Sequence, residues 1–273
     1  MKLGTIIDSS AGLSKAEANK RGWGFLPLYI TIDDVEYGGG VNLDSKSYYE
    51  KITLESDVRT SATPPGQIEE VLKKMSKDND YVIVYALSTK LSSQTNNITL
   101  IAKDYDNVFV VPSFGVGMGI VRDVEVLNEM ADSGSTWEEI KAEAVDLTKS
   151  LFGVIAPVTM KWLVKGGRIG PAASGMANLL KVVPLISLKD GGLEKYGKGR
   201  VFKKAVLKFT KDLYDQFGDT KEYILLNANN PDIKEIQTKM EEIVGTVIYS
   251  DFPSVIVNHI GPGAVALLTR KKR

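Results

Sequence analysis

The alternation of short apolar runs with helix-like segments constrains the fold of this 273-residue chain more than any other feature. Runs rich in Val, Ile and Tyr, which are typical of strands, lie in the first half at Leu3–Ile7, Phe25–Ile32, Tyr81–Leu87 and Asn107–Val111. Segments with apolar residues three and four positions apart, which predict helices, lie at Lys15–Arg21, Ser45–Ile52, Gln67–Lys77 and Ser93–Lys103. This alternation predicts a parallel sheet with helices on both faces.

The second half has a different pattern, in which strands follow one another through short turns. Two strands are expected around a Gly-rich hairpin in Pro184–Val201. Further strands are expected at Tyr223–Asn227, Thr246–Ser250, Ser254–His259 and Ala264–Thr269, and helices at Lys203–Phe217 and Ile233–Ile243. The pattern predicts a mixed or antiparallel sheet with helices on one side. We therefore expect two domains, with residues 1–157 before the boundary near Pro157 and residues 158–273 after it.

Composition excludes several classes of protein. Lys plus Arg and Asp plus Glu both number 34, so no net charge favours nucleic acid or an anionic membrane. The chain has no cysteine, which excludes disulfides and thiolate chemistry. No apolar stretch approaches the ~18 residues of a membrane span, and the N-terminus lacks the pattern of a signal peptide. We expect a soluble protein of the cytoplasm.

Motifs for nucleotides and metals are weak or missing. The segment GLEKYGKG (Gly192 to Gly199) is close to a phosphate-binding loop, but it ends in glycine where a Ser or Thr must hold magnesium. His259 is the only histidine, and no carboxylates cluster near it in the sequence. We therefore predict no cofactor and no metal site.

Polar groups that suit an anion lie in several turns. Hydroxyl-rich segments precede two predicted helices, RTSATPPG at 59–66 and LSTKLSSQT at 87–95, where helix capping alone could explain them. In KGGRIG (Lys165 to Gly170), Lys165 or Arg168 either caps carbonyls or meets an anion. Together with Arg200 and His259, these segments supply donors and positive charge suited to a carboxylate or a phosphate.

The order and content of these segments resemble the DegV family of bacterial lipid-binding proteins. The resemblance is carried by IIDSSAGL at 6–13, TSATPPG at 60–66, LSTKLSSQT at 87–95, LVKGGRIG at 163–170, GKGRVFKKA at 197–205 and HIGPGA at 259–264. It implies a Rossmann-like parallel-sheet domain followed by a smaller mixed-sheet α/β domain, with a lipid site at their interface. It also implies similarity to the fatty-acid-binding subunit of bacterial fatty acid kinase.

The resemblance also implies which residues hold the lipid. One long-chain fatty acid, such as palmitate or oleate, would have its acyl chain enclosed in a tunnel. Its carboxylate would be held by five side chains, those of Thr60, Ser61, Ser92, Arg200 and His259. Gly261 and Gly263 would form a supporting turn that lets the headgroup approach the histidine ring.

The chain departs from the family pattern at two places beside these residues. Ala62-Thr63 replaces the common Gln-Pro after Ser61, and Ser93-Gln94 replaces the usual Gly-Thr after Ser92. Further along, YGGGVNL at 37–43 lacks the usual acidic residue, and Pro112 stands where an aspartate is common. We expect these departures to affect the preference among acyl chains and the docking of a partner more than the binding of the acid.

The expected function is that of a carrier and not of an enzyme. It would present the bound acid to a fatty acid kinase catalytic subunit, which forms an acyl phosphate for phospholipid synthesis, and the partners would include transient contact with a membrane. One alternative is a serine-dependent lipid or ester hydrolase using Ser92 with His259 as base, although no nucleophile elbow and no acidic orienter are evident. Another alternative is an anion-binding or regulatory module that takes no lipid.

Overall fold

In the computed structural model, which describes residues 1–168 and 182–272, the chain divides into two units. The first contains Met1–Lys149 and Pro253–Val255, and the second contains Ser150–Phe252 and Ile256–Arg273. The boundary expected at residue 157 falls instead after Lys149. The reason is that Phe152–Ala156, to which the sequence patterns assign no element, is a strand (β8) inside the second unit's sheet.

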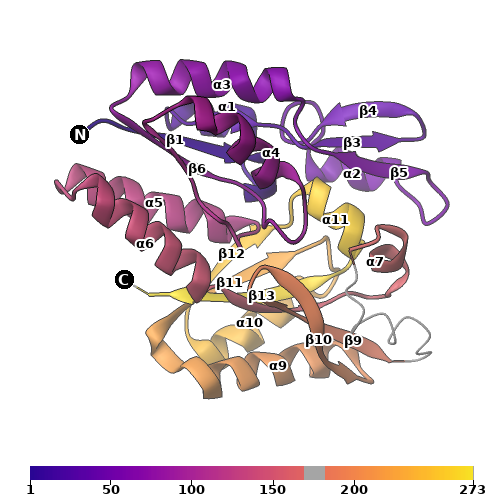
Figure 1. Cartoon of the computed structure of the whole chain (residues 1–273). Helices are drawn as coiled ribbons and strands as arrows, with labels where there is room; N and C mark the ends of the chain where they lie inside the picture. Colours follow the sequence, from indigo (N-terminus) through magenta and orange to yellow (C-terminus); the bar gives the residue numbers. More distant parts are fainter. Residues whose placement is uncertain (169–181, 273) are drawn as a thin grey trace. The chain divides into compact units, whose positions relative to one another are not determined.

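The first unit contains a parallel sheet in the order β2-β1-β6-β7, as the alternation of strands and helices predicts (Figure 1). Its strands are β1 (Leu3–Asp8), β2 (Gly24–Leu26), β6 (Tyr81–Tyr85) and β7 (Val108–Val110). Its helices are α1 (Lys15–Lys20), α2 (Ser45–Lys51), α3 (Pro65–Asp78), α4 (Gln94–Ile101), α5 (Met118–Asp132) and α6 (Trp137–Ser150), with short 3-10 turns η1 (Ser9–Ala11) and η2 (Ala102–Asp104).

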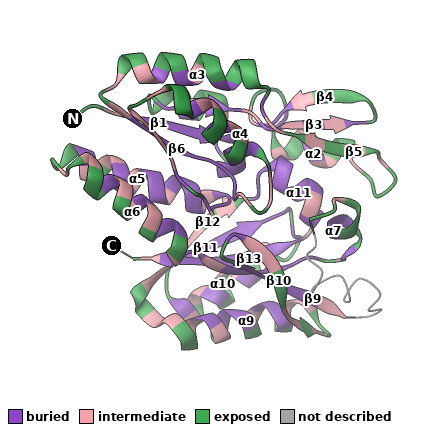
Figure 2. Cartoon of the chain, viewed as in Figure 1, coloured by how far each residue is buried: buried purple, intermediate pink, exposed green. Residues whose placement is uncertain are grey.

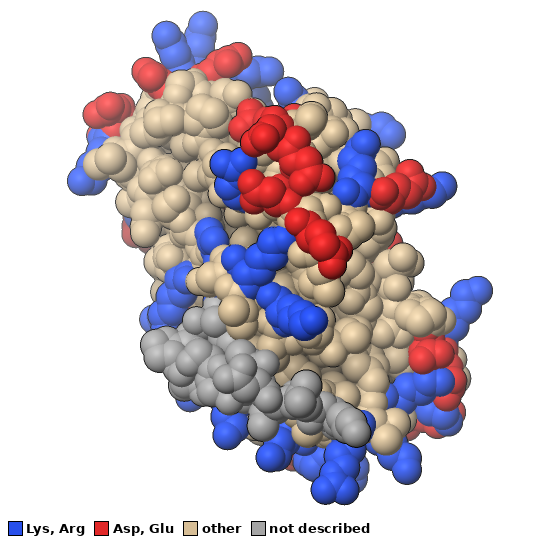
Figure 3. Space-filling model, turned by 90° about the vertical axis from the view of Figure 1, so that its right-hand side faces the viewer, with Lys and Arg blue, Asp and Glu red and all other residues tan. Residues whose placement is uncertain are grey.

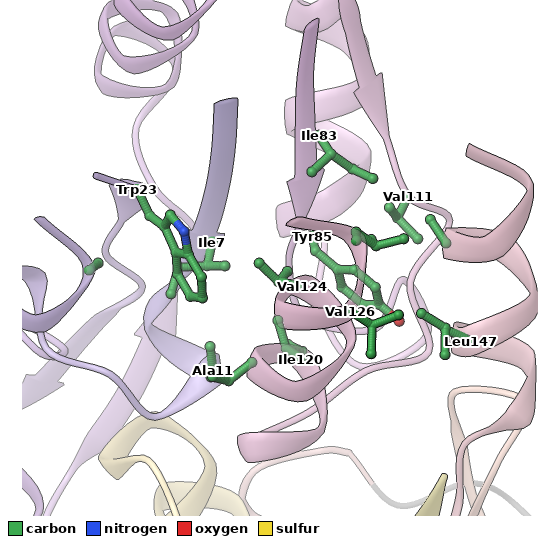
Figure 4. Packing of buried hydrophobic residues seen from close by; sticks show 14 of the residues in the cluster. Ile7, Ala11, Trp23, Ile83, Tyr85, Val111, Ile120, Val124, Val126 and Leu147 are labelled. Carbon is green, nitrogen blue, oxygen red and sulfur yellow. The ribbon is translucent and has the colours of Figure 1, made fainter. Parts of the chain in front are cut away.

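Helices cover both faces of this sheet, which confirms the expected layers. Ile6 packs in a buried cluster with Ile68 and Leu72 of α3. Its neighbour Ile7 points to the other face and packs in a second cluster with Ile120 of α5, which Figure 4 shows from close by. Consecutive strand residues point to opposite faces, so two adjacent isoleucines that are both 0% exposed require a cover on each side.

The predicted strand Phe25–Ile32 is two strands in two different sheets. After β2, the chain passes Pro27 and continues as β3 (Tyr29–Ile32), which pairs antiparallel with β4 (Val35–Gly38) and β5 (Val58–Ser61). Proline lacks the N–H that a continuous ladder needs, so the strand breaks there. This three-stranded sheet, which the sequence patterns do not predict, carries Thr60 and Ser61.

The second unit contains a mixed sheet in the order β10-β9-β8-β13-β11-β12, in which β11 and β12 are parallel and the other pairs are antiparallel. Its remaining strands are β9 (Val183–Lys189), β10 (Gly192–Gly199), β11 (Lys221–Asn227), β12 (Val247–Asp251) and β13 (Val265–Lys271). Its helices are α7 (Lys161–Lys165), α9 (Phe202–Phe217) and α10 (Ile233–Val244), with a 3-10 turn η3 (Gly218–Thr220).

Helices α9 and α10 cover one face of this sheet, as predicted. Phe209 of α9 and Met240 of α10 lie in one buried cluster with Leu225 and Leu267 of the sheet. Figure 2 shows β11 and β13 buried over most of their length. None of the helices in the described part of the chain is both long enough and apolar enough to cross a membrane.

One predicted element of this half is wrong. Ser254–His259, expected as a strand, is part of helix α11 (Ser254–Ile260). The run of Val and Ile favours a strand by residue type, but Val255 and Val257 are both buried, and a short apolar run that is buried all round has no period that separates the two structures.

Candidate functional site

The carboxyl end of β1 is joined to the end of β6 by a buried carboxylate. Asp8 Oδ1 accepts hydrogen bonds from the backbone N–H and the hydroxyl of Ser10, and Oδ2 accepts one from the N–H of Leu87 at 2.9 Å. Asp8 is fully buried, and loss of hydration raises the pKa of its carboxyl to about 6 even though these hydrogen bonds lower it. Asp8 therefore fixes the start of the segment that carries Ser92.

Ser92 lies directly before the first turn of α4. Its Oγ accepts a hydrogen bond from the N–H of Gln94 at 3.2 Å, and its own N–H donates to the carbonyl of Ser88 at 3.2 Å. The hydroxyl is partly buried, and its proton can be donated to an anion while its oxygen accepts from the helix. This arrangement suits the carboxylate-binding role expected for Ser92.

Thr60 and Ser61 are adjacent on β5, so their hydroxyls point to opposite faces of the strand. Thr60 is paired with Ile30, whose side chain is 0% exposed, and it shares that buried face. Ser61 is paired with Tyr29 and is exposed. Thr60 is therefore the hydroxyl of this pair that lies on the covered side.

The two family departures next to these hydroxyls meet each other. Thr63 N–H donates to Gln94 Oε1 at 2.9 Å, and Gln94 Nε2 donates to Thr63 Oγ1 at 2.8 Å. Both side chains are buried, Thr63 at 1% exposed and Gln94 at 0%. The sequence singles out both positions, but nothing in one sequence shows that they are in contact. Within the first unit, these bonds join the segment of Thr60 and Ser61 to the segment of Ser92.

His259 lies in the last turn of α11, in the second unit, and is partly buried. Loss of hydration, with a smaller contribution from the positive charge of Arg168, lowers the pKa of its imidazole to about 4. The ring is therefore neutral at pH 7. A neutral imidazole can donate one hydrogen bond to a carboxylate, and a bound carboxylate would favour its protonated form.

Three glycines next to α7 and α11 allow side chains to pack closely against the backbone, and one of these side chains is that of His259. A Cβ atom at Gly166, just after α7, would overlap Nδ1 of His259. Gly261 has φ +82°, and a Cβ atom there would overlap the ring of Trp162 on α7. Gly263 has φ +81°, and a Cβ atom there would lie 2.7 Å from the side chain of Val158. At Gly261 and Gly263, the place that a Cβ atom would take is thus occupied by these protein side chains.

The KGGRIG segment supplies both backbone packing and charge. Arg168 Nη1 donates to the carbonyl of Gly166 at 2.7 Å, which is the carbonyl-capping alternative considered for this motif. Ile169 and Gly170, the last two residues of the motif, lie outside the described residues. The guanidinium of Arg168 also contributes positive charge near His259.

Arg200 follows strand β10 and lies just before helix α9. Its side chain is exposed, in contrast to the partly buried imidazole of His259. A guanidinium at such a position carries a permanent positive charge that can meet a carboxylate in two parallel hydrogen bonds.

The five residues predicted to hold the carboxylate are divided between the two units. Thr60, Ser61 and Ser92 lie in the first unit, and Arg200 and His259 lie in the second. A cavity of about 970 Å³ in the first unit runs along β2, between residues of α1 and α3, and none of these five residues lines it.

Two further observations concern the charge of the surface and the groups that could bind a metal ion. On the face that Figure 3 shows, acidic and basic side chains are both present, and the acidic ones lie in several separate places. Within residues 1–168 and 182–272, no cluster of three His, Cys, Asp or Glu side chains could hold a metal ion.

The hydrolase alternative needs a carboxylate that orients His259. Such a carboxylate would raise the pKa of the imidazole, but burial and Arg168 both lower it.

Comparisons with known proteins agree with this architecture. A family model described as an uncharacterised protein of the DegV family matches residues 2–272. A DegV domain-containing protein of Mycoplasmopsis pulmonis is 37% identical over 272 residues, which cover 98% of this chain and 94% of the relative. A fatty acid-binding protein of Thermotoga maritima is 28% identical over 293 residues, with 100% of each chain covered. The solved structure of a fatty-acid-binding DegV family protein of Thermus thermophilus has a TM-score of 0.90 at 23% identity, with 100% of each chain covered, and shows the same fold.

Proposed function

Since this chain belongs to the DegV family, we propose that it binds one long-chain fatty acid, palmitate- or oleate-like, with a buried acyl chain. Relatives over the full length that bind fatty acids support the ligand class. The observation in this chain that carries the proposal is Ser92, whose Oγ accepts from the α4 N-terminus at 3.2 Å and whose proton is left for an anion.

The carboxylate is held, in this proposal, by hydroxyl, guanidinium and imidazole groups. Thr60 and Ser92 donate hydroxyl protons, Arg200 supplies permanent charge, and His259 donates from its ring, whereas the hydroxyl of Ser61 lies on the opposite, exposed face of β5. Such donors offset the hydration that a carboxylate loses on burial. The acyl chain supplies most of the affinity, because about fourteen methylenes at ~0.8 kcal/mol each contribute on the order of 11 kcal/mol before ordering costs.

Extraction of lipid from the protein after expression in bacteria tests the ligand. We expect about one saturated or monounsaturated long-chain fatty acid per chain, released by denaturation and identified by mass spectrometry. A protein that carries no fatty acid, and that also fails to bind added palmitate or oleate, would overturn the proposal.

The second part of the proposal concerns what happens to the bound acid. We propose that the carrier presents the carboxylate to a fatty acid kinase catalytic subunit, which transfers the γ-phosphoryl group of ATP to it and forms an acyl phosphate and ADP. The carrier itself performs no chemistry. It would act in the cytoplasm, with transient membrane contact for fatty acid exchange and no role for nucleic acid.

Substitution of His259 tests this second part. His259→Ala removes one headgroup contact but leaves the acyl chain contacts, so the variant should retain its lipid and support slower ATP consumption by the kinase. Fatty-acid-dependent ATP consumption and lipid content are measured on the same preparation. If the variant supports normal kinase turnover, His259 is a packing residue only.

A further inference from the structure

We infer that Thr63 and Gln94 form a positioning pair, which holds the Ser92 hydroxyl at a set place relative to the Thr60 hydroxyl and thereby sets selectivity for a carboxylate headgroup. This inference rests on the proposed function, because it assigns these hydroxyls to the fatty acid carboxylate. It goes beyond that function in assigning a role to two residues that depart from the family pattern.

The pair is buried and mutually satisfied. Gln94 Oε1 accepts from the N–H of Thr63 at 2.9 Å, and Gln94 Nε2 donates to Thr63 Oγ1 at 2.8 Å. Thr63 Oγ1 in turn donates to the carbonyl of Pro27 at 2.8 Å. With 0% of Gln94 exposed and both ends of its amide directed at Thr63, Gln94 acts on a ligand through its neighbours and not by touching it.

The bonds join three segments that are far apart in the sequence. Pro27 lies between β2 and β3, Thr63 lies between β5 and α3, and Gln94 is the first residue of α4. Each of the last two stands shortly after a proposed carboxylate-binding residue, Thr63 after Thr60 and Gln94 after Ser92. A shift of either segment would therefore move a hydroxyl.

Gln94 is coupled to Ser92 directly. Its backbone N–H donates to Ser92 Oγ at 3.2 Å, so the residue whose side chain holds Thr63 also orients the Ser92 hydroxyl. The next residue, Thr95, anchors the same turn, because its hydroxyl donates to the carbonyl of Leu87 at 2.7 Å. Leu87 is held from the other side by Asp8.

The two departures compensate each other chemically. The family pattern described above has proline at position 63, which has no N–H, and threonine at position 94, which is too short to reach across. Thr63 introduces a buried N–H and a hydroxyl, and Gln94 supplies a partner for each. Reverting one residue alone leaves buried polar groups of the pair without partners, whereas reverting both removes these groups together and leaves only the Pro27 carbonyl without its donor.

The test compares palmitate with hexadecanol, which has the same chain length and no carboxylate. Dissociation constants for both are measured for the full chain, for Gln94→Thr, for Thr63→Pro and for the double variant. We expect each single variant to bind palmitate about tenfold more weakly and hexadecanol nearly unchanged. The double variant should bind palmitate more tightly than either single variant, since Thr63 and Gln94 then leave no unpaired group of their own and only the Pro27 carbonyl has lost its donor.

Controls separate positioning from folding. Ser93→Gly restores the neighbouring family residue at an exposed position without a capping hydrogen bond, so it should change neither ligand's affinity. Gln94→Met keeps the volume but forms neither bond, and it replaces Gln94→Thr if that variant does not fold.

Three results would overturn the inference. They are unchanged palmitate affinity in both single variants, equal losses for palmitate and hexadecanol, or a double variant as weak as the two single losses combined. Failure of the original chain to bind palmitate at all would instead overturn the proposed function, and the positioning role with it.

Discussion

The two groups of candidate residues are held in place by different physical means. In the first unit, buried hydrogen bonds between Thr63 and Gln94 join the segments of Thr60 and Ser92, and Asp8 joins the end of β1 to Leu87. In the second unit, side chains pack closely against the backbone, because Gly166 leaves room for the ring of His259 and Gly261 leaves room for the ring of Trp162. The first arrangement should respond to loss of polar groups and the second to added volume, while stability depends on pH through Asp8 in the first unit and through His259 in the second.

The largest effect is expected from added volume in the second unit. Gly261→Ala places a methyl group into the ring of Trp162 at a residue with φ +82°, so we expect it to lower the free energy of unfolding by roughly 2–5 kcal/mol. Gly134→Ala is the control, because Gly134 has φ +86° and no atom within 4 Å of its Cβ position. It should cost only about 1–2 kcal/mol. Urea unfolding measures both, and equal losses would show that packing against Trp162 contributes nothing.

A somewhat smaller effect is expected from Asp8 in the first unit. Burial raises the pKa of its carboxyl from 3.8 to about 6, so between these pH values the folded chain binds more protons than the unfolded chain. The free energy of unfolding therefore falls as pH rises through this range, by about 3 kcal/mol for a shift of this size. Asp8→Asn lacks this dependence.

Unfolding of the original chain and of Asp8→Asn at pH 4, 5, 6 and 7 measures the difference. The stability of the original chain relative to the variant should decrease across this range. Parallel pH profiles of the two chains would mean that folding does not raise the pKa of the Asp8 carboxyl.

The smallest of the expected effects is that of removing a single hydroxyl in the first unit. Ser92→Ala removes a donor to the proposed carboxylate and should weaken fatty acid binding by roughly 1–3 kcal/mol. Ser93→Ala, at the exposed position beside it, should change binding by less than about 0.5 kcal/mol. Titration with palmitate measures both, and the account of the first unit fails if the two variants bind equally well. Turnover of nitrophenyl esters that disappears in Ser92→Ala would support the hydrolase instead.

Much of the layered fold could be predicted from the sequence, because strand and helix periods are local. The parallel sheet covered on both faces and the mixed sheet covered by α9 and α10 follow from that alternation. Local patterns did not show that Ser254–Ile260 is a helix, since Val and Ile favour strands unless tertiary packing decides otherwise. They also missed β8 and the break at Pro27.

The candidate site was harder to predict, since its supports are contacts between distant residues. Thr63 and Gln94 are 31 positions apart, and Asp8 and Leu87 are 79 apart. Likewise, Gly261 and Gly263 make room for Trp162 and Val158, which lie about a hundred positions earlier and outside the turn motif. The motifs indicated where polar groups lie but not what holds them.

The most direct test of the central claim is the pKa of His259 with and without ligand. The chain has one histidine, so its imidazole signals in an NMR titration need no assignment among several. Without ligand, burial and Arg168 should keep the pKa near 4. A bound palmitate carboxylate should raise this pKa, because a nearby negative charge favours the protonated ring, while hexadecanol should not. A pKa that is the same with palmitate, with hexadecanol and without ligand would contradict the claim that His259 holds the fatty acid carboxylate.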